Sequence, residues 1–280
     1  MTGTLYIIAT PIGNLDDISL RAIETLKKVD LIAAEDTRHS LVLLKNYGIN
    51  TPCISLHKFN ENKKSEYLVA ELSLGKNIGL ISDAGTPLVS DPGCHLVKAV
   101  QDAGIPIITI PGPCAAIAAL AASGLATDKF VFEGFLPAKK VAQCERLEAL
   151  KNETRTIILY EAPHRLLQLI DNLLEVMGTE RQIVIAKELT KMHETIIAAP
   201  LPEIKSWLLA DPKRQLGEFV ILIQGAKEQK DVTISADARK ILAILLQELP
   251  TKKAVNITAK ITNCDKRELY QLAIGALQNH

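Results

Sequence analysis

Four short segments combine small residues, prolines and charged side chains in a pattern that suits ligand binding. Each follows an apolar stretch of strand length, and in an open α/β sheet ligands bind beyond the carboxyl ends of the strands. Prolines stiffen such loops, and small residues let a ligand approach the backbone. We therefore expect a binding site formed by Thr10–Asp17 (TPIGNLDD), Ala33–Ser40 (AAEDTRHS), Ile81–Gly93 (ISDAGTPLVSDPG) and Pro111–Leu120 (PGPCAAIAAL).

The second of these segments carries Glu35, Asp36, Arg38 and His39, which could meet a polar substrate. A carboxylate can accept a proton and a guanidinium can hold a phosphate. The alternative is a solvated helix start, where acids are favourably placed at the helix dipole. Asp83 ends a buried strand, where an uncompensated carboxylate would be costly, so it either meets a ligand or accepts hydrogen bonds from its own loop.

Other kinds of site are not indicated. The chain has neither G-x-G-x-x-G nor G-x-x-x-x-G-K-[ST], which argues against a dinucleotide fingerprint and a P-loop. The histidines do not cluster with cysteines or acids at ligand spacing, so we expect no metal. Five cysteines without a C-x-x-C pair argue against a disulfide framework and favour a cytoplasmic location. We expect no signal peptide and no membrane association, since the longest apolar stretch, Cys114–Ala122, is too short to span a bilayer.

Composition indicates a globular protein of two domains with an appendage. The chain has 280 residues, 48% of them hydrophobic, and 32 basic residues balance 32 acidic ones. Zero net charge excludes attraction of the whole molecule to nucleic acid but allows a local basic patch. Aromatic residues make up only 4%, which argues against a broad base-stacking platform, so any nucleic acid would be held mainly through phosphates and shape.

Alternating strands and helices predict an α/β fold throughout the first 226 residues. In the first half we expect a parallel sheet with strands at Thr4–Ala9, Leu31–Ala34, Cys53–Leu56, Ile78–Ser82 and Ile105–Ile110, and a first helix from Ile18 capped by Asp16 or Asp17. In the second half two strands follow each other directly around Lys187–Ala198, which favours a mixed sheet. Its strands are expected at Phe130–Phe132, Thr156–Tyr160, Ile183–Ala186, Thr195–Ala198 and Phe219–Ile223.

The last part of the chain predicts three short amphipathic helices, at Ala236–Leu249, Lys252–Ile261 and Lys266–Leu277. From Thr233 onward there are seven basic and four acidic residues, a local charge of +3 that suits contact with phosphate. The predicted domains are therefore residues 1–124, a parallel-sheet domain; 125–226, a mixed-sheet domain; and 232–280, a helical domain whose charge suits contact with phosphate.

The four loop segments resemble the tetrapyrrole-methylase superfamily and, within it, the ribosomal RNA small-subunit methyltransferase I branch. The second half is similar too, through Glu133–Lys140 (EGFLPAKK), Tyr160–Leu166 (YEAPHRL), Lys187–Thr195 (KELTKMHET) and Gly217–Ile223 (GEFVILI). In the helical tail, Leu249–Val255 (LPTKKAV) and Glu268–Ile274 (ELYQLAI) match as well. The resemblance covers essentially the whole chain. One departure is Val141–Cys144, where such proteins often carry more basic or glycine residues.

The resemblance implies a two-domain fold of the tetrapyrrole-methylase type, a homodimer, and S-adenosylmethionine bound in the cleft between the domains. The implied activity is 2′-O-ribose methylation of a cytidine in the decoding region of small-subunit (16S) ribosomal RNA. The partner would be this RNA, naked or in the assembled subunit. Carried over by motif, the cofactor contacts are Pro11, Asp83, Ala84, Gly85, Thr86, Pro87, Pro113, Cys114, Ala115, Tyr160, Leu189 and Gly217.

For the chemistry, Glu35 or Asp36 would take the hydroxyl proton and Arg38 would hold a neighbouring phosphate. Two alternatives remain: a tetrapyrrole C-methyltransferase, which needs no basic tail, and a non-catalytic RNA-binding assembly factor, which needs no rigid Asp83 loop. The expected RNA contacts are His39, Lys139, Lys140, His164, Arg165, Lys187, Lys252, Lys253, Lys260, Lys266 and Arg267.

Overall fold

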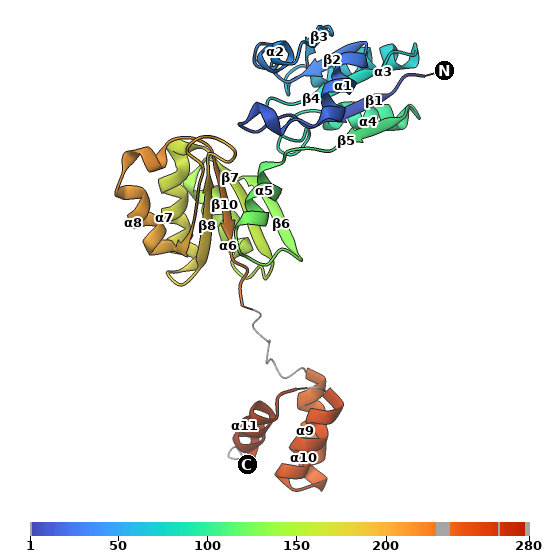
Figure 1. Ribbon diagram of the computed structural model, residues 1–280. Coiled ribbons are helices and arrows are strands. Elements are labelled where there is room, and N and C mark those ends of the chain that lie inside the picture. The colour runs from blue at the N-terminus through green and yellow to red at the C-terminus, as the bar shows by residue number, and fades with distance from the viewer. Residues whose placement is uncertain (1, 228–235, 263, 278–280) are drawn as a thin grey trace. The chain divides into compact units, whose positions relative to one another are not determined.

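The computed structural model describes residues 2–227, 236–262 and 264–277, with the side chains of 275–277 left aside. The chain divides into two compact units, Met1–Gly225 and Ala226–His280. The first unit contains two five-stranded sheets, and the second is helical (Figure 1). The predicted α/β fold with a three-helix tail is confirmed.

The first sheet is entirely parallel, in the order β3-β2-β4-β1-β5. Its strands are short and apolar, and β2 and β4 are buried along their whole length, as expected for a sheet covered on both faces. At one edge, β5 leaves Ile108 and Thr109 exposed. The strands are β1 (Leu5–Ile8), β2 (Leu31–Ala34), β3 (Cys53–Ser55), β4 (Ile78–Ile81) and β5 (Ile107–Ile110).

Alternate residues of each strand point to opposite faces, so the sheet has two cores. Ile32 and Ala34 of β2 pack with α1 and α2, whereas Leu31 and Ala33 pack with α3 and α4. These helices are α1 (Leu20–Lys28), α2 (Thr37–Asn46), α3 (Glu61–Ser73) and α4 (Cys94–Asp102).

The start of α1 differs from the expectation. Asp16 and Asp17 belong to a short 3-10 helix, η1 (Leu15–Asp17), and Asn14 caps it by accepting from the amide of Asp16. The cap of α1 is Ser19, whose hydroxyl accepts a hydrogen bond from the amide of Ala22 at 3.1 Å. Serine is as good an N-cap as aspartate, so the sequence alone did not distinguish Ser19 from the two preceding aspartates as the cap of α1.

The second sheet is mixed, in the order β6-β7-β10-β8-β9. β6 and β7 are parallel and the remaining pairs are antiparallel, including the consecutive strands β8 and β9. The expected mixed sheet is confirmed. Its strands are β6 (Phe130–Phe135), β7 (Thr156–Glu161), β8 (Gln182–Lys187), β9 (Thr195–Pro200) and β10 (Phe219–Ile223).

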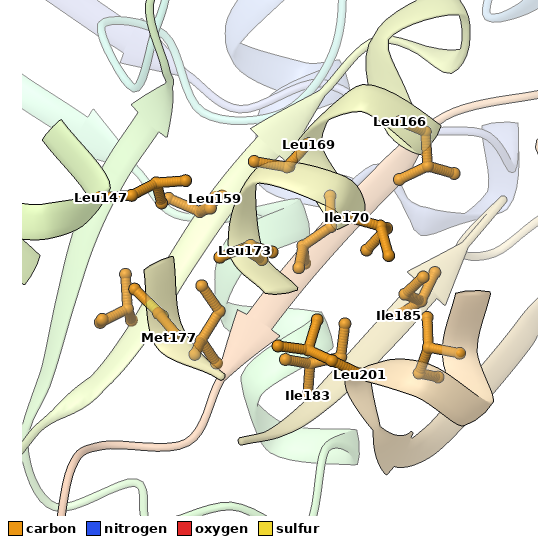
Figure 2. Close-up of a cluster of buried hydrophobic side chains, with 14 of the residues drawn as sticks. Leu147, Leu159, Leu166, Leu169, Ile170, Leu173, Met177, Ile183, Ile185 and Leu201 are labelled. Atoms are coloured by element: carbon orange, nitrogen blue, oxygen red, sulfur yellow. The ribbon is translucent and has the colours of Figure 1, made fainter. Parts of the chain in front are cut away.

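One face of this sheet holds the largest apolar cluster among the described residues, in which Leu169, Ile170 and Leu173 of α7 meet Leu159 and Ile185 of the sheet. Figure 2 shows these side chains between α7 and the strands. The helices on this face are α6 (Lys140–Leu150), α7 (Leu166–Met177) and α8 (Leu201–Leu209), with the 3-10 turns η2 (Pro163–Arg165) and η3 (Pro212–Gln215) beside them.

The opposite face is covered by α5 (Ala115–Ala122), which lies beside the second sheet in Figure 1. Ala116, Ala119 and Leu120 pack against Ile158 and Val220. The predicted boundary at residue 124 places α5 with the first domain, whereas its packing places it with the second sheet. An alanine-rich helix fits either neighbour by composition, so the sequence pattern did not distinguish them.

The second unit consists of α9 (Ala236–Glu248), α10 (Thr251–Thr262) and α11 (Lys266–Leu277). Its small core contains Leu242, Ala254, Val255, Ala259 and Leu269. The amide of Arg267 donates to the Asp265 carboxylate at 2.7 Å, which caps the start of α11.

Candidate functional site

The four loops singled out by sequence are bound to one another at the carboxyl edge of the first sheet. Thr10 and Gly85 exchange backbone hydrogen bonds of 2.9 and 3.0 Å, which joins the loops after β1 and β4. Gly85 adopts φ 80°, a conformation that favours glycine. The Thr86 hydroxyl donates to the carbonyl of Pro113 at 3.0 Å, which adds the loop after β5.

The loop after β2 is attached through Asp83. Its Oδ1 accepts a hydrogen bond from the backbone amide of Asp36 at 3.0 Å. Asp83 therefore does accept hydrogen bonds from backbone, but from a neighbouring loop rather than from its own. The same carboxylate also lines a cavity, so a structural and a ligand-facing position are compatible.

This cavity, here called the central cavity, has a volume of about 440 Å³. Its walls come from both sheets of the first unit. Ile12, Glu35 and the loop 83–91 contribute from the first sheet. The second sheet and α5 contribute the rest of a largely apolar wall that includes Phe135, Ala186 and Val220. Apolar walls with a few polar groups are typical of small-molecule sites.

Strained backbone surrounds the central cavity. Leu88 and Ser90 have φ of 73° and 70°, and Glu188 and Thr190 have φ of 52° and 65°. Non-glycine residues in this region are uncommon and are held there by surrounding structure, most often at functional sites. Leu189, between Glu188 and Thr190 in the turn after β8, lines the cavity.

The charges of the central cavity have one sign. Five carboxylates line it, those of Glu35, Asp83, Asp91, Glu161 and Glu218. None of its described lining residues is Lys, Arg or His. Two of them are compensated, since Glu161 pairs with Arg165 at 3.1 Å and Glu218 with Lys191 at 2.9 Å. Glu35, Asp83 and Asp91 have no ion pair within the described chain, so the cavity favours a cation over a phosphate.

Burial and mutual repulsion shift these carboxyls. Burial, together with the charges of Asp91 and Asp83, raises the pKa of Glu35. Burial also raises the pKa of Asp91. Burial raises the pKa of Tyr160 to about 12, so its hydroxyl stays protonated. That hydroxyl accepts a hydrogen bond from the amide of Ala116 at 3.1 Å and thereby fixes the first turn of α5.

Asp36 has a different environment from Glu35, although they are neighbours. It caps α2 by accepting from the amide of Arg38 at 2.8 Å, and it forms a two-pronged ion pair with the Arg38 guanidinium. These hydrogen bonds lower the pKa of Asp36 to about 2. Arg38 itself is exposed. The helix-start interpretation therefore describes the position of Asp36, whereas Glu35 faces the cavity.

Eight of the twelve residues expected at the cofactor line the central cavity: Asp83, Ala84, Gly85, Thr86, Cys114, Ala115, Tyr160 and Leu189. Pro87, Pro113 and Gly217 do not line it. The carbonyl of Pro113 accepts the hydrogen bond from the lining residue Thr86. Gly217, with φ 102°, directly precedes the lining residue Glu218. Among lining residues that were not predicted, Asp91 lies in the proline-rich segment Ile81–Gly93 and Glu161 in the motif Tyr160–Leu166, both singled out in the sequence, whereas Phe135 and Ala186 gave no signal.

A second cavity of about 360 Å³, here called the side cavity, shares Ile12, Asp83, Ala84 and Glu218 with the first. Pro11 and His39 line it, and so does Lys191. Lys191, in the connection between β8 and β9, is held by Glu188 at 2.8 Å and Glu218 at 2.9 Å. It lies against Gly13, where an added Cβ would be 2.6 Å from the Lys191 Cγ.

The residues expected to contact RNA are scattered. Arg165 is largely buried and donates to the carbonyls of Leu136 and Pro137 besides its ion pair with Glu161, so it is engaged within the fold. Lys140 pairs with Glu175 at 2.9 Å. His164 and Lys139 are exposed, Lys187 ends β8 half-buried, and Lys252, Lys253, Lys260, Lys266 and Arg267 are all exposed on the helical unit.

Among the described residues, no group of three or more His, Cys, Asp or Glu side chains is arranged to hold a metal ion. In the same residues no helix is both long and apolar enough to cross a membrane.

The sequence profile of a family described as Tetrapyrrole (Corrin/Porphyrin) Methylases matches residues 4–205, and that of the RsmI C-terminal HTH domain matches residues 232–278. The chain belongs to the tetrapyrrole methylase family. The resemblance inferred from the loop motifs is thus confirmed, and so are its implications of a methyltransferase and of S-adenosylmethionine as cofactor.

Relatives within the tetrapyrrole methylase family match over nearly the whole chain. The chain is 51% identical over 279 residues to ribosomal RNA small subunit methyltransferase I of Haemophilus influenzae, covering 99% of each protein. It is 50% identical to the protein of the same name from Pasteurella multocida, covering 98% of each.

Solved structures share the fold at low identity. The methyltransferase CobJ is 19% identical with a TM-score of 0.60, covering 80% of this chain and 95% of that one. Uroporphyrin-III-C-methyltransferase from Thermus thermophilus is 18% identical with a TM-score of 0.56, covering 79% and 94%. These structures support the tetrapyrrole-methylase fold of the first unit.

Proposed function

We propose that this protein transfers the methyl group of S-adenosylmethionine to the ribose 2′-oxygen of a cytidine in the decoding region of small-subunit ribosomal RNA. The observation that carries the proposal is a sequence identity of 50–51%, over nearly the full length, to relatives named ribosomal RNA small subunit methyltransferase I. The tail matched by the HTH profile adds a unit that tetrapyrrole chemistry does not need.

The central cavity suits the cofactor. When bound, S-adenosylmethionine supplies an electrophilic methyl group on a sulfonium, and it carries a second positive charge on its amino group. The unpaired carboxylates Glu35, Asp83 and Asp91 favour both charges electrostatically. The apolar wall of Phe135, Leu189 and Val220 suits the adenine ring.

Glu35 is the proton acceptor that the geometry favours over Asp36. Glu35 lines the central cavity, and its raised pKa makes its carboxylate the stronger base. Asp36 is tied to Arg38 and has a pKa of about 2, so its carboxylate accepts a proton poorly. With in-line attack on the methyl group, positioning supplies most of the acceleration and Glu35 removes the proton of the hydroxyl.

The position of the side cavity and of the exposed Arg38 supports a role in binding the substrate. His39 and Lys191, whose side chains can donate hydrogen bonds, line the side cavity together with Asp83. Arg38 is exposed on the first turn of α2. A ribose that approaches from this cavity would reach the central cavity across Ile12 and Asp83, two of the four residues common to both. Arg38 would then hold a phosphate next to the reacting nucleotide.

The proposal includes a cytoplasmic homodimer. An apolar surface supports the dimer, because α5 leaves Ile117 50% exposed and the edge strand β5 leaves Ile108 37% exposed. Isolated apolar side chains are ordinary on surfaces, but a helix made only of Ala, Ile and Leu with one side exposed suits an interface.

The experiment that tests the function is methyl transfer to small ribosomal subunits isolated from cells that lack this protein. Purified full-length protein and labelled S-adenosylmethionine are added to assembled subunits, to protein-free small-subunit RNA and to a tetrapyrrole acceptor. We expect one 2′-O-methylated cytidine in the decoding region. The proposal would be contradicted if only the tetrapyrrole were labelled. It would also be contradicted if the protein bound the cofactor but labelled none of the three acceptors.

A further inference from the structure

Residues 57–64, which comprise the end of the connection from β3 and the first turn of α3, present an exposed aromatic ring among lysines. Phe59 is 95% exposed, and its only ring contact in the described chain is the edge of His57, with centroids 6.2 Å apart. Lys58 and Lys63 are exposed, and neither has an ion pair within the described residues. Lys64 lies 5.9 Å from the ring of Tyr67. We call this segment the β3–α3 corner.

Hydrogen bonds of Asn60 hold the backbone of the corner in a turn. The amide of His57 donates to Asn60 Oδ1 at 2.9 Å, and the amide of Asn60 donates back to the carbonyl of His57 at 2.9 Å. Asn60 Nδ2 also donates to the carbonyl of Ser55 at 3.3 Å. These bonds hold the chain on either side of Phe59, so the ring is presented outward on a fixed backbone.

A buried carboxylate joins the corner to the cofactor loop. Glu61, 6% exposed, accepts hydrogen bonds from the amides of Gly93 at 3.0 Å and His95 at 2.8 Å. Gly93 is the last residue of the loop that begins at Asp83. Glu61 therefore fixes the first turn of α3 against the same loop that lines the central cavity.

The corner also lies at the edge of the sheet where the site is formed. β3 is the neighbour of β2, and the amide of Leu56, just after β3, donates to the carbonyl of Ala34 at 2.7 Å. Glu35 follows Ala34 directly. The corner and the loop of Glu35, Asp36 and Arg38 thus leave adjacent strands at the same edge (Figure 1).

The stability of the fold does not explain why an aromatic residue and three lysines occur at this corner. An exposed Phe gains little from burial, and lysines in the first turn of a helix oppose its dipole. A single-stranded nucleic acid satisfies both groups, because a base stacks on an aromatic face and phosphates pair with lysines. A protein partner would use the ring but would need acidic groups opposite Lys58, Lys63 and Lys64.

We propose that the β3–α3 corner binds single-stranded RNA next to the target nucleotide, with one base stacked on Phe59 and the phosphates held by Lys58, Lys63 and Lys64. This inference rests on the proposed function and adds a second RNA-binding surface, on the first sheet, to the basic tail. It assigns one stacking residue, which agrees with the low aromatic content of the chain.

The first test measures stacking directly in the full-length protein. Phe59→Trp is made together with Trp207→Phe, which removes the one natural tryptophan. A short single-stranded oligoribonucleotide should quench the fluorescence of the new indole. An unchanged spectrum at RNA concentrations that saturate the protein would overturn the proposal.

The second test measures the consequence for the reaction. Phe59→Ala should raise the KM for small ribosomal subunits about tenfold, because stacking of one base is worth about that factor. Phe59→Tyr should retain most of the wild-type value, and cofactor affinity by calorimetry should be unchanged in both. The matched control is Leu74→Ala, since Leu74 is 78% exposed at the other end of α3.

The third test addresses the phosphates. Lys63→Ala with Lys64→Ala should lower the slope of log affinity against log salt by about 0.7 for each phosphate that is no longer neutralised. Lys27→Ala with Lys45→Ala is the charge-matched control, since both lie in the last turns of their helices, away from this sheet edge.

The outcomes separate this inference from the proposed function. Wild-type protein that methylates the RNA, combined with corner variants that bind and react as wild type, would overturn the corner alone. Wild-type protein without RNA methylation would instead contradict the proposed function. Corner variants that bind naked RNA normally and fail only on subunits would point to a ribosomal protein, which also overturns the proposal.

Discussion

The backbone amide of Asp36 donates a hydrogen bond to the side chain of Asp83 at 3.0 Å, across 47 residues of sequence. Through this bond the loop after β2 and the loop after β4 form one edge of the central cavity. The Asp83 carboxylate therefore has two functions at once: it fixes the backbone next to Glu35, and it adds negative charge to a cavity that we assign to a cationic cofactor.

Two substitutions of Asp83 separate these functions. Asp83→Asn keeps an oxygen that accepts from the Asp36 amide but removes the charge, whereas Asp83→Ala removes both. We expect Asp83→Ala to weaken S-adenosylmethionine binding about tenfold or more, and Asp83→Asn to weaken it less. Calorimetry measures both affinities. Equal affinity of the two variants and the wild type would show that the cofactor does not use this carboxylate.

Glu35 should determine the acid side of the pH profile. Its pKa is raised by burial and by Asp91 and Asp83, so a base at this position is lost at a higher pH than for an ordinary glutamate. We expect kcat to fall as pH drops through this raised pKa. Glu35→Gln should lower kcat strongly and remove the pH dependence, whereas Asp36→Asn should leave the position of the acid limb unchanged.

The same shift has a consequence for stability. A carboxyl whose pKa is higher in the folded state than in the unfolded state stabilises the fold at low pH and loses that contribution as pH rises through the folded pKa. Glu35→Gln should therefore raise the melting temperature at pH 8 and have little effect at pH 4. A variant that melts below the wild type at pH 8 would show that the ionised Glu35 is stabilised in the fold.

Tyr160 should act as a cap for α5 at a distance of 44 residues in sequence. Cys114, at the N-cap position, makes no side-chain hydrogen bond to the helix, and the amide of buried Ala116 instead donates to the Tyr160 hydroxyl. Tyr160→Phe leaves that amide unpaired and should cost about 1–3 kcal/mol of stability. Cofactor affinity should also fall, because Cys114 and Ala115 line the central cavity.

Urea unfolding measures the effect, with Tyr67→Phe as the control because the Tyr67 side chain is 46% exposed. A midpoint of Tyr160→Phe equal to that of the control would mean that water replaces the hydroxyl at no cost.

Elements that depend on local pattern were predictable from the sequence. The strand β10 is an uninterrupted apolar run, Phe219–Ile223, and the predicted bounds agree with the structure to the residue. The loops at the carboxyl ends were predictable because Pro and Gly follow apolar runs at Thr10, Asp83 and Pro111. Parallel strands then place these loops at one edge without further information.

Relationships between distant residues were not predictable in the same way. Glu35 and Asp36 are adjacent acids in the sequence, and only the turn that makes Asp36 the cap of α2 sends the other one towards the cavity. Phe135 reaches the cavity because β6 has a bulge between Phe132 and Gly134, which no periodicity reveals. Arg165, an expected RNA contact, also binds Glu161 and two carbonyls, an arrangement that requires the folded β7 and η2.

The basic tail should contribute to RNA binding independently of the cofactor. Its five predicted contacts, among them Lys252 and Lys260, are exposed on a unit with its own core. Ending the chain after Gly225, where the first compact unit ends, should leave both sheets folded and S-adenosylmethionine affinity unchanged. RNA affinity should fall, and its dependence on salt should become shallower by about 0.7 for each phosphate that the tail neutralises, since each such pairing releases counterions. Binding isotherms at several salt concentrations, for both chain lengths, measure the two slopes. Identical slopes would exclude the tail lysines from RNA contact and leave the first unit to bind RNA alone.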